Sequence, residues 1–337
     1  MTGFWIWGLF VFIGSFVGVE LFRRACVKYR WLDIPNSRSS HVQPTPRGGG
    51  TAVVFFVSVG FCLSNPSPEL RILALLGLGI AILGFVDDRV GVPAVVRFIS
   101  QIVAASVGLY AVVGQTILVL KVDDFQVAHG AVAIGLAVFF VVWMTNLYNF
   151  MDGIDGIEGI QVLTVGLLAA FFSWEKSELF GAQAYLLLAT GAAGFLWWNW
   201  SPARIFLGDV GSGFFGFFFG MLAIFSASSG VLQVGISLIL HATFLADTIY
   251  TLVRRIAQGE KPHVAHRTHA YQKLTQKGFS HGWVSAAYGS VNLLWLGPIA
   301  WLVFSELVPA WVGLVVAYIP LFGICYRTRA GTREQAA

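Results

Sequence analysis

Long apolar segments alternate with short polar segments along almost the whole chain. An α-helix needs about 20 mostly apolar residues to cross the hydrocarbon core of a bilayer, and eleven segments approach or reach that length. They are residues 4–22, 49–63, 70–86, 94–113, 131–148, 156–172, 181–198, 210–227, 232–253, 283–304 and 309–325. The pattern predicts an all-α, polytopic integral membrane protein with about 11 transmembrane helices, or about ten if one segment does not span.

The composition supports this prediction. Hydrophobic residues make up 57% of the 337 positions and charged residues only 11%, with a mean hydropathy of +0.75. Soluble domains carry about 25% charged residues, so a soluble globular protein is excluded. No long polar segment divides the chain, and residues 1–337 are interpreted as a single integral-membrane domain. The three cysteines, Cys26, Cys62 and Cys325, show no CxxC spacing and are interpreted as lipid-facing or packing residues, not as a disulfide or metal site.

Positive charges concentrate in every second polar segment. An N-terminus outside the membrane puts residues 23–48, 87–93, 149–155, 199–209, 254–282 and 326–337 on the inner side. When residues at helix ends, such as Arg97, are counted with the nearer side, only Arg71, Lys121 and Lys176 of the 21 Lys and Arg residues fall elsewhere. Because cytoplasmic loops carry the excess of Lys and Arg, we expect these segments to face the cytoplasm. The formal charge of +4 follows from this asymmetry and indicates no nucleic-acid partner.

The longest segment on the predicted outer side, residues 115–130, contains the alternating run T116-I-L-V-L-K-V122. Alternation of this kind is typical of a strand. We therefore expect a small β-hairpin on the outer face.

Acidic residues gather at the predicted inner boundary of the membrane. Asp87 and Asp88 end one apolar segment, Asp152 and Asp155 follow another, and Asp209 precedes a third. Carboxylates beside apolar spans are costly and usually functional. Mg²⁺ takes oxygen ligands and bridges to substrate phosphates, and Arg side chains bind phosphate oxygens in a forked geometry. With the Arg and His residues of the same segments, these carboxylates indicate a site for a divalent cation and a phosphorylated ligand.

Several of these motifs have a second interpretation. The Asp87–Asp88 pair could be a solvated helix cap. The three-residue spacing of Asp152 and Asp155 would place both carboxylates on one helical face. G211-S-G-F-F-G216 is interpreted as helix packing by small residues and not as a dinucleotide site. Asp247, inside an apolar segment, either hydrogen-bonds a neighbouring helix or acts directly.

Histidines recur at every third position in one inner segment. His263, His266 and His269 surround Arg267 and can line one side of a helical turn. A zinc site would need a further ligand, and no Cys or acidic residue lies nearby in the sequence. Phosphate binding by His and Arg is preferred, with zinc as the alternative.

Five motifs occur in one order between about residues 33 and 275. They are P44-T-P-R-G-G-G50, G84-F-V-D-D-R89, N149-F-M-D-G-I-D-G156, N199-W-S-P-A-R-I-F-L-G-D-V-G-S212 and H266-R-T-H269. Together they resemble the polyprenyl-phosphate N-acetylhexosamine-1-phosphate transferases, the glycosyltransferase 4 family. H-R-T-H departs from the consecutive histidines of the peptidoglycan branch and is more similar to the O-antigen-initiating branch.

The resemblance implies roles for particular residues. Asp209 and Asn149 would hold Mg²⁺, for which Mn²⁺ can substitute. The catalytic set would be Asp87, Asp88, Asp152 and Asp155, with the first pair beside the lipid phosphate. The substrate-binding set would be Arg47, Arg97, Asn199, Phe206, His263, His266, Arg267 and His269. Within that set Asn199 and Phe206 would recognise uracil, and the His and Arg residues of the loop around 263–269 would contact the pyrophosphate and sugar.

The implied reaction transfers an N-acetylhexosamine-1-phosphate from a UDP-sugar to undecaprenyl phosphate. It releases UMP and forms undecaprenyl-pyrophosphate-sugar, the first step of O-antigen or other surface polysaccharide synthesis. Direct displacement is preferred over an aspartyl-phosphate intermediate, although both agree with these residues.

The resemblance also implies a location and leaves alternatives. We expect a multi-pass protein of the bacterial cytoplasmic (inner) membrane, with its active site at the cytoplasmic face, and we allow for a homodimer. One alternative is the muramoyl-pentapeptide phosphotransferase that forms lipid I of peptidoglycan. The other is a membrane transporter of a phosphorylated substrate, whose key charges should instead lie near the middle of the bilayer.

Overall fold

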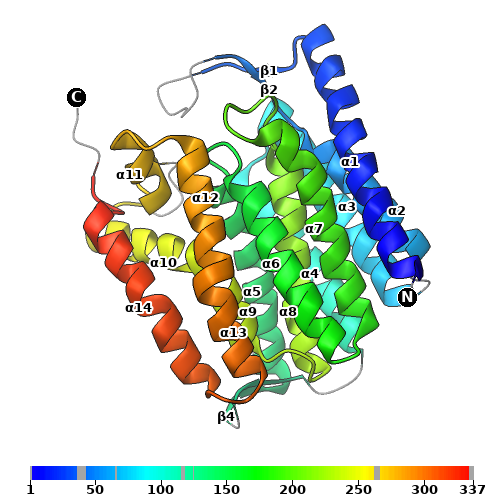
Figure 1. Ribbon diagram of the computed structural model, residues 1–337, viewed down its shortest axis with the longest axis vertical. Coiled ribbons are helices and arrows are strands. Elements are labelled where there is room, and N and C mark those ends of the chain that lie inside the picture. Colours follow the sequence, from blue (N-terminus) through cyan, green and yellow to red (C-terminus); the bar gives the residue numbers. More distant parts are fainter. Residues whose placement is uncertain are drawn as a thin grey trace.

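The computed structural model describes residues 2–35, 43–64, 67–114, 118–123, 125–261 and 266–333. Its helices form one bundle, with two short strand pairs outside it (Figure 1). The helices are α1 (Thr2–Lys28), α2 (Gly50–Ser64), α3 (Pro68–Val90), α4 (Ala94–Val113), α5 (Gly130–Met151), α6 (Ile157–Glu175), α7 (Leu179–Asn199), α8 (Asp209–Ser228), α9 (Val234–Leu240), α10 (Ala242–Ala257), α11 (Ala270–Gln276), α12 (His281–Val291), the π-helical turn η1 (Asn292–Leu296), α13 (Gly297–Phe304) and α14 (Ala310–Thr328). The strands are β1 (Leu32–Asp33), β2 (Thr45–Pro46), β3 (Val119–Val122) and β4 (Phe125–His129).

The spanning helices confirm an all-α, multi-pass membrane protein. Within the described residues, nine helices are long and apolar enough to cross a bilayer, with His281–Phe304 counted as one. The number is ten if α9 and α10, which meet at an 80° bend, form one span. The expected number of about 11 also includes α2. Its 15 residues extend only about 22 Å, less than the hydrocarbon core of about 30 Å.

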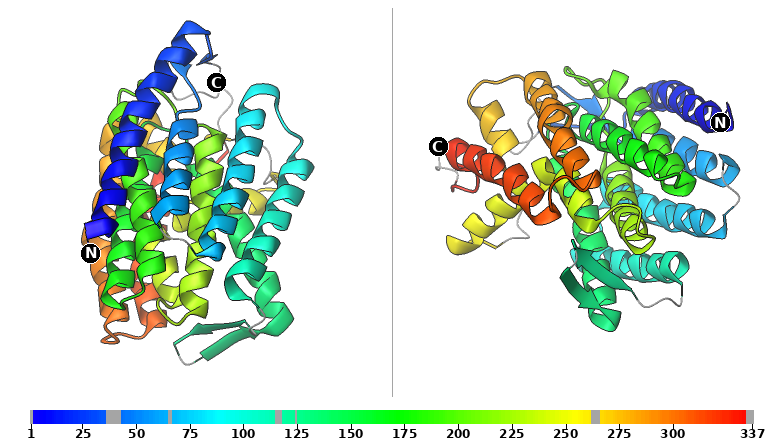
Figure 2. Two further views of the ribbon diagram at one scale, coloured as in Figure 1. Left: turned by 90° about the vertical axis from the view of Figure 1, so that its right-hand side faces the viewer. Right: turned by 60° about the horizontal axis from the view of Figure 1, so that its bottom comes forward.

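The two ends of the bundle differ. Strands β1 and β2 and helix α11 lie at one end, and β4 lies at the opposite end (Figure 1). Helix α1 extends past the rest of the bundle at the first end (Figure 2). The expected hairpin is confirmed, because β3 pairs antiparallel with β4, with Val119 opposite His129. The side of the membrane that each end faces, and the homodimer, stay predictions.

Glycines allow α8 to pack closely against α5. Helix α8 is the most buried of the nine spanning helices among the described residues. A Cβ at Gly216 would overlap the carbonyl oxygen of Met144, and a Cβ at Gly220 would lie 2.9 Å from the Cα of Val141. Small residues at such crossings allow close backbone approach, which drives helix association in lipid. The interpretation of G211-S-G-F-F-G216 as a packing motif is confirmed.

This crossing predicts a difference between two identical substitutions. Gly216→Ala should destabilise the protein by about 1–3 kcal/mol, because an added methyl group must push α8 away from α5. Gly135→Ala on α5 is the matched control, since no atom lies within 4 Å of a Cβ there. It should leave stability unchanged or raise it by about 0.5–1 kcal/mol through helix propensity. Thermal unfolding of the purified variants in detergent measures both effects, and equal midpoints would contradict the close packing.

Candidate active site

Two motifs far apart in the sequence are joined by backbone hydrogen bonds. The Phe206 N–H donates to the carbonyl of Pro46 at 2.8 Å. The Phe206 carbonyl accepts from the N–H groups of Gly48 and Gly49 at 3.1 and 2.9 Å. A Cβ at Gly50 would lie 2.6 Å from the Cα of Gly211, so only glycine allows this approach. The pairing places Arg47 beside the first residues of α8.

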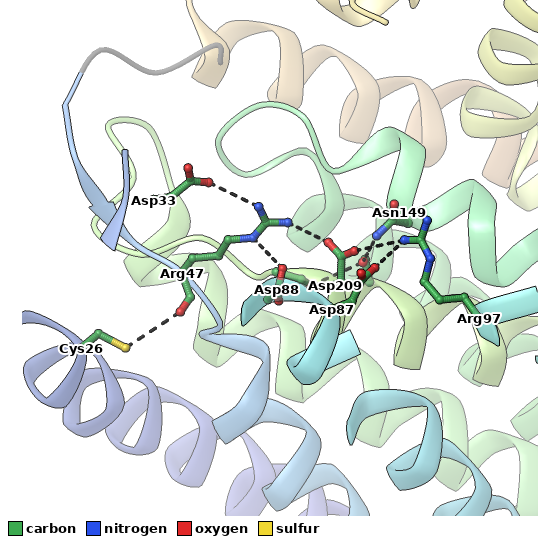
Figure 3. A network of polar contacts seen from close by, with 10 residues as sticks. Cys26, Asp33, Arg47, Asp87, Asp88, Arg97, Asn149 and Asp209 are labelled. Atoms are coloured by element: carbon green, nitrogen blue, oxygen red, sulfur yellow. Dashed lines mark hydrogen bonds and ion pairs between the residues drawn. The ribbon is translucent and has the colours of Figure 1, made fainter. Parts of the chain in front are cut away.

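Arg47 lies among three carboxylates (Figure 3). Its Nε is 2.8 Å from Asp88 Oδ1, its Nη2 is 2.7 Å from Asp209 Oδ1, and its Nη1 is 3.4 Å from Asp33 Oδ2. Burial alone would lower the pKa of Arg47, but Asp88, Asp209 and Asp33 raise it above its ordinary value. The guanidinium therefore stays charged and joins the β1–β2 segment to the ends of α3 and α8.

A second arginine lies on the other side of Asp209. Arg97 Nη1 forms a short ion pair with Asp87 Oδ2 and lies 3.9 Å from Asp209 Oδ2. The other oxygen of Asp87 accepts the Val92 N–H at 2.6 Å. Asn149 Nδ2 donates to Ser212 Oγ at 3.3 Å. The structure therefore brings together the two expected arginines, the aspartate pair, Asp209 and Asn149 (Figure 3).

The expected metal residues surround a small cavity. Asp87, Arg97, Asn149 and Asp209 all line a space of about 60 Å³. Its carboxylate and amide groups offer the oxygen donors that Mg²⁺ prefers, and Mg²⁺ usually takes one or two carboxylates and completes its shell with phosphate and water. No group of three or more His, Cys, Asp or Glu side chains suited to a metal occurs in the part of the chain that the structure describes. The residues present thus suit a cation whose remaining ligands come from a bound phosphate and water.

The motif N149-F-M-D-G-I-D-G156 ends one helix and precedes the next. Helix α5 ends at Met151 and α6 begins at Ile157. Gly156 has a φ of +79°, a conformation that favours glycine and interrupts the helix. The expectation that Asp152 and Asp155 share one helical face is therefore wrong, because the intervening residues form a loop.

Asp152 lies in this loop and is partly exposed. Desolvation raises the pKa of its carboxyl group to about 7, with Arg47 opposing the shift and Asp209 and Asp155 adding to it. The group therefore titrates close to neutral pH in the free protein. A catalytic role for Asp152 stays a prediction.

Asp155 joins three segments. His281 Nδ1 lies 3.3 Å from Asp155 Oδ2, and the Ala203 N–H donates to the same oxygen at 3.2 Å. Ser285 Oγ donates to the backbone carbonyl of Asp155 at 2.7 Å. Burial alone would raise the pKa of Asp155, but His281 and the Ala203 N–H hold it below its usual value. Through these contacts Asp155 connects loop 152–156 with loop 199–209 and with the start of α12.

Asn199 is buried and hydrogen-bonded within the protein. Its Oδ1 accepts the Gly156 N–H and its Nδ2 donates to the Ile205 carbonyl, both at 2.9 Å. These two bonds hold the amide between loop 152–156 and loop 199–209. Phe206 is partly exposed. The uracil-binding role of both residues stays a prediction.

The histidine motif is a turn that precedes a short helix. His263 lies outside the described residues. The rings of His266 and His269 stack with centroids 4.9 Å apart. Because α11 begins only at Ala270, the expectation that these histidines lie on a helical turn is wrong. Desolvation, with His269 and Arg255 adding to it, lowers the pKa of His266 to about 3, so this imidazole is neutral at pH 7. The described members of the motif and their surroundings form no three-residue zinc site.

Three contributors were not anticipated from the sequence. Asp33 pairs with Arg47, Ser212 with Asn149, and His281 with Asp155. Ser212 is the last residue of one recognised motif, and Asp33 lies at the start of the region that carries the motifs. The polar side chain of each was therefore an available signal. His281 lies 126 residues from Asp155, and no spacing rule connects the two.

Known proteins share sequence with much of this chain. Residues 70–227 match Glycosyl transferase family 4. The chain is 28% identical over 271 residues to a probable undecaprenyl-phosphate N-acetylglucosaminyl 1-phosphate transferase of Bacillus subtilis, covering 77% of this chain and 74% of that protein. It is 28% identical over 362 residues to a decaprenyl-phosphate N-acetylglucosaminephosphotransferase of Mycolicibacterium smegmatis, covering 93% and 87%. It is 32% identical over 229 residues to a phospho-N-acetylmuramoyl-pentapeptide-transferase of Heliobacterium modesticaldum, covering 62% and 68%.

The region that matches the family carries Asp87, Asn149 and Asp209, which the structure gathers around one cavity, and also Asp88 beside it. The three relatives are transferases by name, which leaves the transporter alternative without support. The chain belongs to glycosyl transferase family 4, as its five motifs implied.

Proposed function

We propose that this protein transfers N-acetylglucosamine-1-phosphate, or a related N-acetylhexosamine-1-phosphate, from a UDP-sugar to undecaprenyl phosphate. The products are UMP and undecaprenyl-pyrophosphate-sugar, and the step begins synthesis of O-antigen or another surface polysaccharide. The observation that carries the proposal is that Asp209 lies between Arg47 and Arg97 and, together with Arg97, lines a small cavity at the loop-bearing end of an apolar bundle. The names of two relatives support the sugar and the polyprenyl phosphate.

The proposed chemistry is an exchange between two phosphates. An oxygen of the lipid phosphate attacks the phosphorus that carries the sugar, and the bond from that phosphorus to the oxygen of UMP breaks. The second pKa of a phosphate monoester is about 6, so the nucleophile is largely dianionic at pH 7 without a general base. The barrier is the repulsion between two anionic groups, which Arg47 and Arg97 reduce by binding phosphate oxygens.

Direct displacement is the preferred route. Asp88 is paired with Arg47, and Asp87 with Arg97. An ion-paired, hydrogen-bonded carboxylate is a poor nucleophile because the attacking electron pair is already engaged. We therefore assign this pair to orienting the two arginines. Bound Mg²⁺ would supply Lewis-acid stabilisation of charge on the transferred phosphoryl group, with Asp209 and Asn149 as its protein ligands.

An apolar groove supports a lipid acceptor. A space of about 730 Å³ lies between α5, α9, α10 and α14, and its lining residues include Phe139, Trp143, Leu245, Ile249, Tyr318 and Phe322. Helix α5, which forms one wall, ends next to Asn149 and Asp152. A polyprenyl chain is wholly apolar, so it can replace membrane lipid in this groove and gain van der Waals packing there, with its phosphate toward the polar loops.

Release of UMP tests the proposal. Purified protein is incubated with undecaprenyl phosphate, Mg²⁺ and UDP-N-acetylglucosamine, UDP-N-acetylgalactosamine or UDP-N-acetylmuramoyl-pentapeptide. UMP that forms with an N-acetylhexosamine donor, and only when lipid phosphate is present, is the expected result. Activity with the muramoyl-pentapeptide donor alone would establish the peptidoglycan alternative. No UMP with any donor from folded protein would overturn the proposal.

Replacement of Asp209 should remove most activity. Asp209→Asn weakens cation binding and leaves Arg47 and Arg97 without their shared carboxylate. We expect turnover to fall at least about 100-fold, the kinetic equivalent of several kcal/mol. Glu175→Gln, an exposed neutralisation at the far end of α6, is the control and should retain activity. Unchanged turnover in Asp209→Asn at limiting Mg²⁺ would rule out the metal assignment.

Asp152 should give the reaction an acidic limb. The folded carboxyl group has its pKa raised to about 7 and is therefore mostly protonated below that pH. If the anion is needed, kcat/KM for the UDP-sugar should rise with pH through about 7, since this ratio reports ionisation of the form that binds that substrate. Added Mg²⁺ should move the limb to lower pH, because a nearby cation favours the carboxylate. Asp152→Asn should lose the limb from its residual activity; an unaltered profile would assign the limb to another group.

A further inference from the structure

Asp247 is a carboxylate inside the bundle that the reaction described above does not use. It lies in the second turn of α10, just after the 80° bend between α9 and α10, and its side chain is only 1% exposed. A buried anion is stable only when it is paired and hydrogen-bonded. Every donor around Asp247 therefore has a structural consequence.

Five groups donate to this carboxylate. Oδ1 accepts from the Ala270 N–H at 2.7 Å and from His269 Nδ1 and Thr251 Oγ1, both at 3.2 Å. Oδ2 accepts from Tyr288 Oη at 2.9 Å and from the Tyr271 N–H at 3.2 Å. A carboxylate has about four lone-pair sites, so Asp247 has none left for a substrate or a metal. It can act on the reaction only through the groups that it holds.

One of those groups is the imidazole of His269. A carboxylate only accepts hydrogen bonds, so His269 Nδ1 must carry a proton where it meets Asp247. The other ring nitrogen, Nε2, is then the one that can accept a hydrogen bond from a further partner, and it lies in a residue that is only 2% exposed. His269 is the last residue before α11, and the two backbone N–H groups that follow it are bound by the same carboxylate. The ring and the start of the helix are therefore positioned together.

The other connection leads to the loop that follows α5. Tyr271 Oη donates to the carbonyl of Phe150 at 3.1 Å. A Cβ at Gly153 would overlap that hydroxyl group, so α11 lies directly against the loop. Asn149 directly precedes Phe150, and Asp152 directly precedes Gly153. A shift of Asp247 would thus move the histidine turn and the loop near the expected metal site at once.

We propose that Asp247 is a positioning residue for the transfer reaction: it orients His269 so that Nε2 serves the sugar diphosphate, and it holds α11 against the loop that carries Asp152. This inference rests on the proposed function for its kinetic consequences. Its geometric part, the proton on His269 Nδ1, does not.

The first test compares two variants that disturb the same carboxylate. Asp247→Asn replaces one oxygen by an N–H donor facing other donors, and kcat should fall at least about 100-fold. Tyr288→Phe removes one hydrogen bond from Oδ2 but does not touch His269, so kcat should change less than about 5-fold. Both are compared as folded, monodisperse protein. Similar kcat losses in the two variants would reduce Asp247 to a stabilising residue and overturn the proposal.

The second test replaces His269, alone and together with Asp247. Asparagine can keep an N–H donor near the position of Nδ1 but has no group at the position of Nε2. His269→Asn should stay folded, because the bond to Asp247 is retained, yet lose at least about 100-fold in kcat. Asp247→Asn/His269→Asn should lose less than the product of the two single losses, since residues that act as one unit are not additive. Wild-type kcat in His269→Asn, or losses that multiply in the double variant, would contradict the proposal.

A spectroscopic test is independent of activity. The chain has seven histidines, and ¹⁵N-histidine labelling reports which ring nitrogen carries the proton. The His269 signal is the one absent from His269→Asn. Its Nδ1 should be protonated in the wild type and lose that preference in Asp247→Asn. An unprotonated Nδ1 in the wild type would overturn the inference even if UMP release supports the transferase, and a protonated Nδ1 would support it even if no donor were found.

Discussion

Arg47 lies between Asp33, Asp88 and Asp209 at one end of a bundle that is otherwise apolar. Without a cation, the carboxylates at the ends of α3 and α8 would repel each other where water is scarce, and each would lose hydration without gaining a partner. The guanidinium offsets that cost and holds α3, α8 and the β1–β2 segment together. The same group that completes the fold is also the one that a phosphate can compete for, because phosphate and carboxylate bind an arginine fork in the same way.

The site around this centre is held mainly by side chains that bind backbone groups. Asn199 binds the backbone at Gly156 and Ile205, Asp155 binds Ala203, and Asp247 binds the start of α11. Loops at the end of a bundle have few apolar contacts to position them, so buried polar side chains take that task. Several residues that the motifs suggested for catalysis or substrate recognition thus also have a structural role, and their substitution would disturb neighbouring loops as well as chemistry.

The arrangement suits an enzyme with one substrate in the bilayer and one in the adjacent water. Arg97, Asp87 and Asp209 line a small cavity at the end of the bundle, while an apolar groove runs between α5, α10 and α14. Beyond the bend between α9 and α10, Leu245 and Ile249 line the groove, and Asp247 of the same helix binds the start of α11. Helix α10 thus connects the apolar groove with the histidine turn.

The sequence by itself determined the membrane class, the helices and most of the candidate site. Runs of about 20 apolar residues predict spanning helices, because a helix satisfies its backbone hydrogen bonds within one segment, where hydrocarbon offers no partner. Motifs that each lie within one short segment identified Asp87, Asn149 and Asp209 as candidate site residues. Three things depended on the tertiary structure: that Asp152 and Asp155 lie in a loop, that His281 holds Asp155, and that Asp247 holds His269. The last two are contacts between residues 126 and 22 positions apart in the sequence. They follow from how helices pack and bend, which no local pattern encodes.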